Sequence, residues 1–141
     1  MNILVSACLL GCSCRYDGKS KADERVLCLK DRHTLIPVCP EQLGGLCTPR
    51  LPAEIQGEKV IRRDGADVTK EYRKGAQEAL GLYTLLSCDA AILKARSPSC
   101  GKGCIYDGTF SGTLTDGNGI TAALFRERGI PVFTEDETQQ L

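Results

Sequence analysis

The sequence predicts a single α/β domain, a three-layer sandwich built on a mostly parallel sheet. Short apolar runs alternate along the chain with amphipathic stretches, which is the pattern of β-α-β units. The length of 141 residues corresponds to one domain, covering residues 1–141. An apolar content of 42% excludes a disordered chain and is sufficient for an ordinary core.

Four apolar runs predict the strands of the sheet. These runs span residues 3–7, 34–38, 90–94 and 130–133. Pro37 and Pro131 have no backbone N–H to donate to a neighbouring strand. The second and fourth strands are therefore expected at the edges of the sheet, or to start late.

One long amphipathic helix is predicted between the second and third strands. Asp67 or Thr69 can cap its first turn. Apolar residues then recur at helical spacing, and we expect them to pack on the sheet. This stripe consists of Tyr72, Ala76, Ala79, Tyr83 and Leu86. Shorter helices are expected over residues 22–30 and 121–128, the second ending at Gly129.

Two further segments are predicted to lie on the surface. Residues 58–63, followed by Asp64 and Gly65, are expected to form a short strand and a turn. The polar tail, residues 134–141, is expected to fray.

Charge and hydropathy exclude several classes of function. The chain carries 18 basic and 18 acidic residues and no basic block, so charge alone does not favour binding to nucleic acid or to an anionic membrane. No apolar run approaches the roughly 20 residues of a membrane span, and the segment before Cys8 lacks the features of an export signal. We therefore expect a cytoplasmic protein with reduced thiols.

The nine cysteines are not explained by the fold, because a core of this size needs no disulfides. Their odd number excludes complete internal pairing. The chain contains no Cys-x-x-Cys, the spacing on which zinc ribbons, thioredoxin-like pairs and ferredoxins rely. The cysteines therefore point to another kind of metal site or to catalysis.

Three cysteines lie in the segments that follow predicted strands. Cys8 follows the first strand, Cys39 follows the second, and Cys100 lies in the loop after the third. In open α/β sheets, ligands bind outside the carboxyl ends of the strands. We therefore expect these thiols to converge on one site, although buried cysteines can also pack simply as small apolar side chains.

Four polar side chains lie close to these cysteines in the sequence and are candidates for the same site. Glu41 follows the second strand closely and could act as a base or ligand, or lie on the surface in the first turn of a helix. Ser97 and Ser99 precede Cys100, where their hydroxyls could bind substrate or cap a turn. Lys94 ends the third strand and could hold an anionic or carbonyl oxygen.

A short motif occurs twice. Residues 14–18 and 104–108 share the pattern Cys-x-Tyr-Asp-Gly. Asp-Gly alone indicates only a turn. The repetition together with Tyr and Cys predicts two turns that pack around one pocket.

The motifs taken together resemble a known family, and they occur in that family's order and spacing. They are Cys8-Leu9-Leu10-Gly11 with Cys14-Arg15-Tyr16-Asp17-Gly18, Pro37-Val38-Cys39-Pro40-Glu41 with Gly44-Gly45-Leu46 and Thr48-Pro49-Arg50, Asp64-Gly65 with Asp67-Val68-Thr69, and Ile92-Leu93-Lys94 with Ser97-Pro98-Ser99-Cys100-Gly101 and Ile105-Tyr106-Asp107-Gly108-Thr109-Phe110-Ser111-Gly112. Over residues 3 to 135 the chain resembles the small bacterial and archaeal domain family that includes 2-thiouracil desulfurase.

The resemblance implies a [4Fe-4S] cluster held by Cys8, Cys39 and Cys100, with one iron open to the sulfur of a substrate. It implies a hydrolytic reaction in which water replaces the sulfur of a small thiolated nucleobase, such as 2-thiouracil, or of a related thioamide, giving the oxo-compound and sulfide. By the same resemblance, Glu41 would activate the water and Ser97 would assist near the open iron.

Two alternatives remain at this point. If Cys14 or Cys104 reached the fourth iron, the site would be closed, and the protein would be a zinc or iron–sulfur module with a structural or redox role. A persulfide-carrying sulfur-transfer protein would need an exposed cysteine of low pKa near a cation, such as Cys100 near Arg96. The sequence assigns no role to Cys12, Cys28, Cys47 and Cys88.

Overall fold

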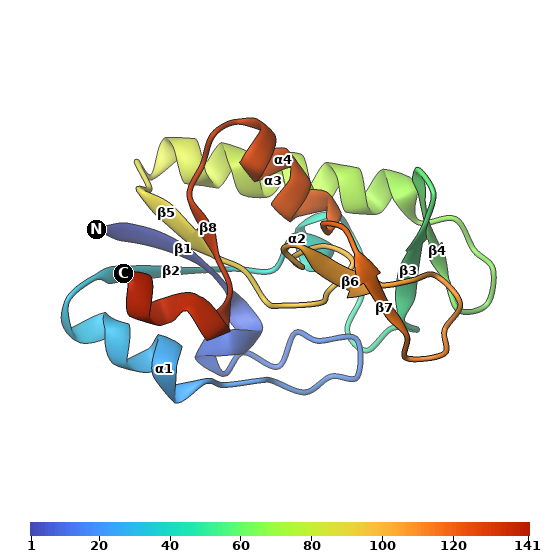
Figure 1. Cartoon of the computed structure of the whole chain (residues 1–141), viewed down its shortest axis with the longest axis horizontal. Helices are drawn as coiled ribbons and strands as arrows, with labels where there is room; N and C mark the ends of the chain where they lie inside the picture. Colours follow the sequence, from blue (N-terminus) through green and yellow to red (C-terminus); the bar gives the residue numbers. More distant parts are fainter.

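The computed structural model describes all 141 residues and is built on a four-stranded sheet of order β2-β1-β5-β8 (Figure 1). Its strands are β1 (Asn2–Ser6), β2 (Thr34–Val38), β5 (Ala90–Ile92) and β8 (Val132–Phe133). All neighbouring strands run parallel. The four predicted strands and their parallel arrangement are confirmed. The two edge strands are β2, which contains Pro37, and β8, which Pro131 directly precedes. This agrees with the expectation that proline, which cannot donate a backbone hydrogen bond, lies at the edges of the sheet.

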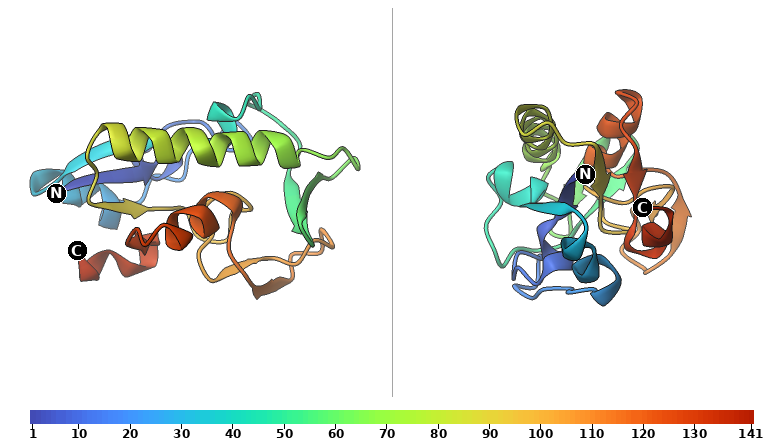
Figure 2. Two further views of the ribbon diagram at one scale, coloured as in Figure 1. Left: turned by 90° about the horizontal axis from the view of Figure 1, so that it is seen from above. Right: turned by 90° about the vertical axis from the view of Figure 1, so that its left-hand side faces the viewer.

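Helices cover both faces of the sheet, which makes the three predicted layers (Figures 1 and 2). On one face lie α3 (Thr69–Leu85) and α4 (Ile120–Glu127), whose rings Tyr83 and Phe125 meet edge to face at 5.6 Å. On the other face lie the 3-10 helix η1 (Ala7–Leu10), α1 (Glu24–Leu27) and the 3-10 helix η2 (Cys28–Asp31). Thus the single helix predicted over residues 22–30 is two short pieces.

The core has two parts, one on each face of the sheet, and successive side chains of a strand belong to different parts. Leu4 and Ala91 pack toward α3 and α4, whereas Ile3, Val5 and Ile92 pack toward the short helices. This alternation follows from the pleat of a strand, in which successive side chains point to opposite faces.

The long helix departs from its prediction at both ends. Ala76 and Ala79 of its stripe are buried as expected, but α3 ends at Leu85 and leaves Leu86 exposed. At the other end, Tyr72 is buried among Ala53, Val60 and Val68 rather than on the sheet. The first turn of α3 extends past the sheet, toward the ends of its strands.

Two hairpins and a short helix lie beyond the carboxyl ends of the strands (Figure 1). They are β3 (Ala53–Gln56) with β4 (Lys59–Arg62), β6 (Cys104–Tyr106) with β7 (Leu114–Asp116), and α2 (Pro40–Leu43). The strand predicted over residues 58–63 corresponds to β4. Its partner β3 and the second hairpin were not predicted.

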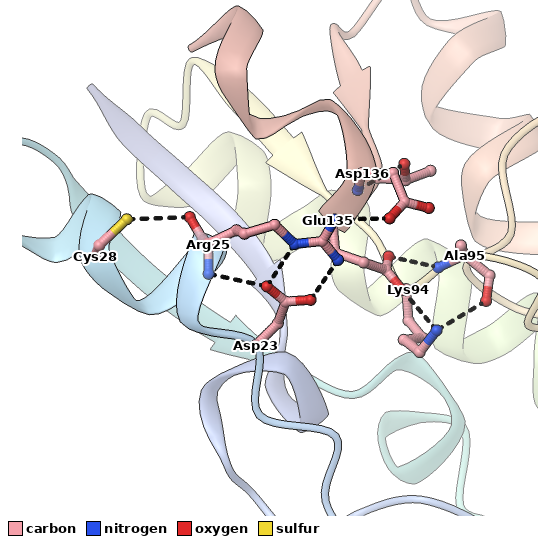
Figure 3. A network of polar contacts seen from close by, with 8 residues as sticks. Asp23, Arg25, Cys28, Lys94, Ala95, Glu135 and Asp136 are labelled. Carbon is pink, nitrogen blue, oxygen red and sulfur yellow. Dashed lines mark hydrogen bonds and ion pairs between the residues drawn. The ribbon is translucent and has the colours of Figure 1, made fainter.

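The expectation that the tail frays is wrong. Residues Glu135–Gln140 form the 3-10 helix η3, which opens with a capping box between Thr134 and Glu137. Glu135 is buried and pairs with Lys94, and Asp136 pairs with Arg25 (Figure 3). A polar tail is therefore ordered by specific partners on the body of the domain.

None of the helices combines the length and the apolar character that a membrane crossing requires.

Candidate active site

A cavity of about 550 Å³ opens where the strands end. Cys8, Cys39 and Cys100 all line it. Cys8 lies in η1 directly after β1, Cys39 precedes the first turn of α2, and Cys100 lies in the loop after β5. Cys8 and Cys100 are buried and Cys39 is half-buried. Topology therefore brings three thiols that are distant in the sequence to one cavity.

The loop that carries Cys100 is held by a serine. Ser97 Oγ accepts hydrogen bonds from the backbone N–H of Ser99 at 3.1 Å and of Cys100 at 3.0 Å. Ser97 itself lines the cavity. The hydroxyl donates no hydrogen bond within the protein, so its proton is free to be donated to another group.

Burial raises the pKa of the Cys100 thiol, and a hydrogen bond with Ser6 lowers it. Burial has the larger effect, and the resulting pKa is about 12. The pKa of Cys39 is also raised, by a hydrogen bond with Cys14 and by burial. Metal binding to such thiols must displace their protons. A raised pKa does not favour a persulfide carrier, which needs an exposed thiol of low pKa.

A fourth cysteine, Cys14, lies at the same cavity. It is buried and lines the wall, and Cys39 Sγ donates to its carbonyl oxygen at 3.9 Å. A hydrogen bond with Cys39 lowers the pKa of the Cys14 thiol, whereas Cys8 and burial raise it, with a net rise to about 11. Cys104 instead lines a separate cavity of about 380 Å³. Of the two cysteines considered as a fourth ligand, only Cys14 is near the other three.

The donor set fits an iron–sulfur cluster. No group of three or more His, Cys, Asp or Glu side chains is placed to hold a single metal ion. In a cluster each cysteine binds a different iron, so its ligands stand farther apart than those of one ion. The cavity is also rich in cations, which suits a group held by thiolates. Its charged lining consists of Arg15, Lys21, Arg50, Arg63, Lys94 and Arg96 against Glu41 and Glu54.

Glu41 lies at the wall of the cavity, in the first turn of α2. Its Oε1 accepts a hydrogen bond of 2.6 Å from Tyr72 Oη and one of 3.3 Å from Arg50 Nε. Neither donor is predicted from the sequence, because Tyr72 fits the apolar stripe of α3 and Arg50 lies in a loop. The one available signal was the hydroxyl of a tyrosine at a buried position, which needs a polar partner.

Ser99 and Lys94, the two residues predicted to bind substrate, occupy different surroundings. Ser99 does not line the cavity; it is 1% exposed, and its hydroxyl pairs with Thr121 Oγ1 at 2.9 Å. We therefore remove Ser99 from the substrate-binding set. Lys94 does line the cavity, but its Nζ donates to Glu135 Oε1 at 2.6 Å, so its charge is already paired.

The two Tyr-Asp-Gly turns face the same cavity, as their repetition predicts. Tyr16 and Tyr106 both line it. Glu54 holds the second turn, because its Oε1 accepts from the backbone N–H of Gly108 at 2.9 Å and of Phe110 at 3.2 Å. No local pattern in the sequence points to Glu54, because its role depends on a hairpin that was not predicted.

Known proteins match this chain over nearly its full length. A family model described as 2-thiouracil desulfurase matches residues 3–137. An uncharacterized protein of Bacillus subtilis (strain 168), YbbK, is 44% identical, and the match covers 99% of each chain. The solved structure of TudS, described as a [4Fe-4S]-dependent thiouracil desulfidase, is 48% identical, with a TM-score of 0.93 over 99% of this chain and 94% of that one. The chain therefore belongs to the 2-thiouracil desulfurase family.

Proposed function

We propose that this protein is a [4Fe-4S]-dependent desulfurase that replaces the sulfur of a small thiolated nucleobase, such as 2-thiouracil, with oxygen. The observation that carries the proposal is the cavity at the strand ends, where Cys8, Cys39 and Cys100 lie together with Glu41 and Ser97. The 48% identity to a thiouracil desulfidase supports it. The nine free thiols suit the reducing cytoplasm, and residues 1–141 serve as a single iron–sulfur domain.

In this proposal Cys8, Cys39 and Cys100 hold the cluster, each through its own thiolate. The cluster supplies a Lewis acid for sulfur, since three protein ligands leave one iron open. Each ligand comes from a different strand end, so the three approach the cavity from separate segments of backbone. This arrangement leaves the side of the cavity bounded by the hairpins for substrate.

Glu41 acts as the general base toward water. Its Oε1 is occupied by Tyr72 and Arg50, but its Oε2 has no partner within the protein. Oε2 is not fully buried, and because Glu41 lines the cavity, this oxygen is accessible from it. A carboxylate oxygen in this position can accept a proton from water as the water attacks the ring carbon.

Ser97 acts as the proton donor. Its oxygen accepts from two backbone N–H groups, its hydroxyl donates to no group of the protein, and its side chain lines the cavity. The reaction balances without electron transfer: thio-base and water give oxo-base and hydrogen sulfide. Water gives up two protons, one to Glu41 as its oxygen attacks the ring carbon and one as the C=O bond forms, and the C–S bond breaks with its electrons on sulfur. The departing sulfur takes up two protons, and the proton that Ser97 donates is replaced from those that water released.

The first test is anaerobic reconstitution with iron and sulfide, followed by incubation with 2-thiouracil. We expect about four irons and four sulfides per chain, loss of the thiouracil absorption, and release of uracil and sulfide. Cys8→Ser, Cys39→Ser and Cys100→Ser should each lose the cluster. Cys28→Ser is the matched control, because Cys28 is exposed and its thiol donates only to Arg25 O. A fully loaded protein that converts no thiolated base would overturn the proposal.

The second test separates the roles of the chain's own residues from cluster binding. Glu41→Gln and Ser97→Ala should lower kcat by about 100-fold or more, the usual contribution of a general base or acid. Iron and sulfide contents should stay at the wild-type level in Glu41→Gln. An unchanged kcat in Glu41→Gln would remove Glu41 from the mechanism.

A further inference from the structure

We propose that Tyr72 and Arg50 are positioning residues that together bind one oxygen of Glu41, so that the other oxygen faces the cavity. The inference rests on the proposed role of Glu41 as general base. It assigns a task to two side chains that line the cavity and that the proposed mechanism does not otherwise use.

Both donors bind the same carboxylate oxygen. Tyr72 Oη lies 2.6 Å from Glu41 Oε1, and Arg50 Nε lies 3.3 Å from it. The hydroxyl of Tyr72 makes no other hydrogen bond, and the residue is 2% exposed. A buried tyrosine directed at a single carboxylate oxygen therefore has one polar partner, and that partner is Glu41.

Arg50 is itself held rigidly. Its side chain is 6% exposed, and its two terminal nitrogens reach three further acceptors. These are Thr48 Oγ1 at 3.1 Å, Cys47 O at 3.2 Å and Cys14 O at 3.0 Å. The planar guanidinium is thus fixed at several points and presents Nε in one direction. A lysine could not reproduce this geometry, because it carries one ammonium group on a flexible stem.

The terminal torsion of a glutamate is normally broad, so a free carboxylate exchanges its two oxygens readily. Two donors on Oε1 remove this freedom, and hydrogen bonds to a charged acceptor are stronger than neutral ones. Oε2 has no protein partner and remains accessible. Because the carboxylate is already held in one orientation, this conformational freedom is not lost during the attack on the ring carbon and does not add to the barrier.

The backbone brings the donor to the acceptor. Helices α2 and α3 touch at Gly44 and Gly75, which have no side chains to separate them. A Cβ atom on Gly44 would lie 2.0 Å from Glu71 O, and one on Gly75 would lie 1.8 Å from Pro40 O. This contact places the first turn of α3, with Tyr72, beside the first turn of α2, with Glu41. The pairing of Tyr72 with Glu41 is therefore a consequence of how the two helices cross.

The test uses Tyr72→Phe and Arg50→Lys in the cluster-loaded protein, with Tyr83→Phe as the matched control. Tyr83 lies on the same helix but packs on Phe125 and makes no hydrogen bond with Glu41. We expect Tyr72→Phe and Arg50→Lys each to lower kcat about tenfold or more, with KM for 2-thiouracil changed less than about twofold. Iron and sulfide contents should be unchanged, and Tyr83→Phe should match the wild type.

Two further measurements separate positioning from a merely structural role. In the Glu41→Gln background, Tyr72→Phe should cause no additional loss of kcat, because its effect passes through Glu41. A crystal structure of Tyr72→Phe should show the Glu41 carboxylate turned or in more than one conformation.

The outcomes distinguish failure of this inference from failure of the proposed role of Glu41. Wild-type kcat in Tyr72→Phe and Arg50→Lys overturns the inference, as does an equal loss from Tyr72→Phe with and without Glu41. Loss of the cluster in these variants also overturns it, because the residues would then support cluster binding. If instead Glu41→Gln keeps full activity, it is the proposed role of Glu41 that fails.

Discussion

Lys94 Nζ lies 2.6 Å from Glu135 Oε1, across 41 residues of sequence, and Glu135 Oε2 accepts from the backbone N–H of Ala95 at 2.9 Å (Figure 3). This pair attaches the C-terminal helix η3 to the start of the loop that carries Ser97 and Cys100. The end of the chain thus supports one wall of the cavity.

Removal of this carboxylate should destabilise the domain. In Glu135→Gln the Lys94 ammonium loses its partner in a largely buried position, and we expect the free energy of unfolding to fall by about 1–3 kcal/mol. Chemical denaturation of the variant and the wild type measures this difference. Asp64→Asn is the control, because the Arg62–Asp64 pair is exposed and should contribute little. Equal losses in both variants would contradict the prediction.

The crossing of α2 and α3 depends on Gly75. Gly75→Ala places a methyl group against Pro40 O, so we expect the helices to separate, with a loss of about 1–3 kcal/mol in stability and a lower kcat. Gly81→Ala on the same helix meets no atom within 4 Å and should stabilise the protein by about 0.5–1 kcal/mol. Thermal unfolding and the thiouracil assay compare the two. Similar behaviour of both variants would show that the close approach is not required.

Cys14 decides whether the cluster has an open iron. If Cys8, Cys39 and Cys100 are the only ligands, Cys14→Ser should keep its iron and sulfide and retain activity. Cys104→Ser is the control, since Cys104 lines the other cavity. Iron analysis and the visible absorption spectrum check this outcome. Loss of about one iron in Cys14→Ser alone would identify a closed, four-cysteine site.

Asp67 stabilises the start of α3 in a pH-dependent way. Its Oδ1 accepts from Thr69 Oγ1 at 2.6 Å and from Thr69 N at 2.9 Å, and these hydrogen bonds hold the pKa of Asp67 below its usual value. Because the pKa is lower in the folded than in the unfolded state, the ionised carboxylate of Asp67 stabilises the fold at neutral pH. This stabilisation is lost as pH falls through about 4 and below. Asp67→Ala should therefore unfold more easily than the wild type at pH 7. The difference should shrink toward about pH 3, as followed by urea unfolding.

Asp116→Ala provides the comparison for that experiment, because Asp116 is exposed and accepts no side-chain hydrogen bond. Its unfolding midpoint should follow the wild type at every pH. A difference between Asp67→Ala and wild type that does not change with pH would show that the carboxylate charge is not involved.

Much of the site could be predicted because it depends on strand ends. The apolar runs that become β1, β2 and β5 are local patterns, and parallel strands present their carboxyl ends at one edge. Cys8, Cys39 and Cys100 follow those strands, so their meeting at one cavity required no knowledge of side-chain contacts. The same reasoning misplaced Ser99, because a residue in a turn can point either way; here its hydroxyl pairs with Thr121 in α4.

Local patterns were enough to predict the parallel sheet, its edge strands and the gathering of three thiols, because hydrophobic periodicity and proline chemistry act over a few residues. The groups that surround Glu41 and the position of the tail depend instead on the packing of the whole chain. Tyr72 and Glu135 reach their partners through contacts 31 and 41 residues away in sequence. Such contacts depend on how helices cross and which buried polar groups need partners, and these are properties of the packed chain.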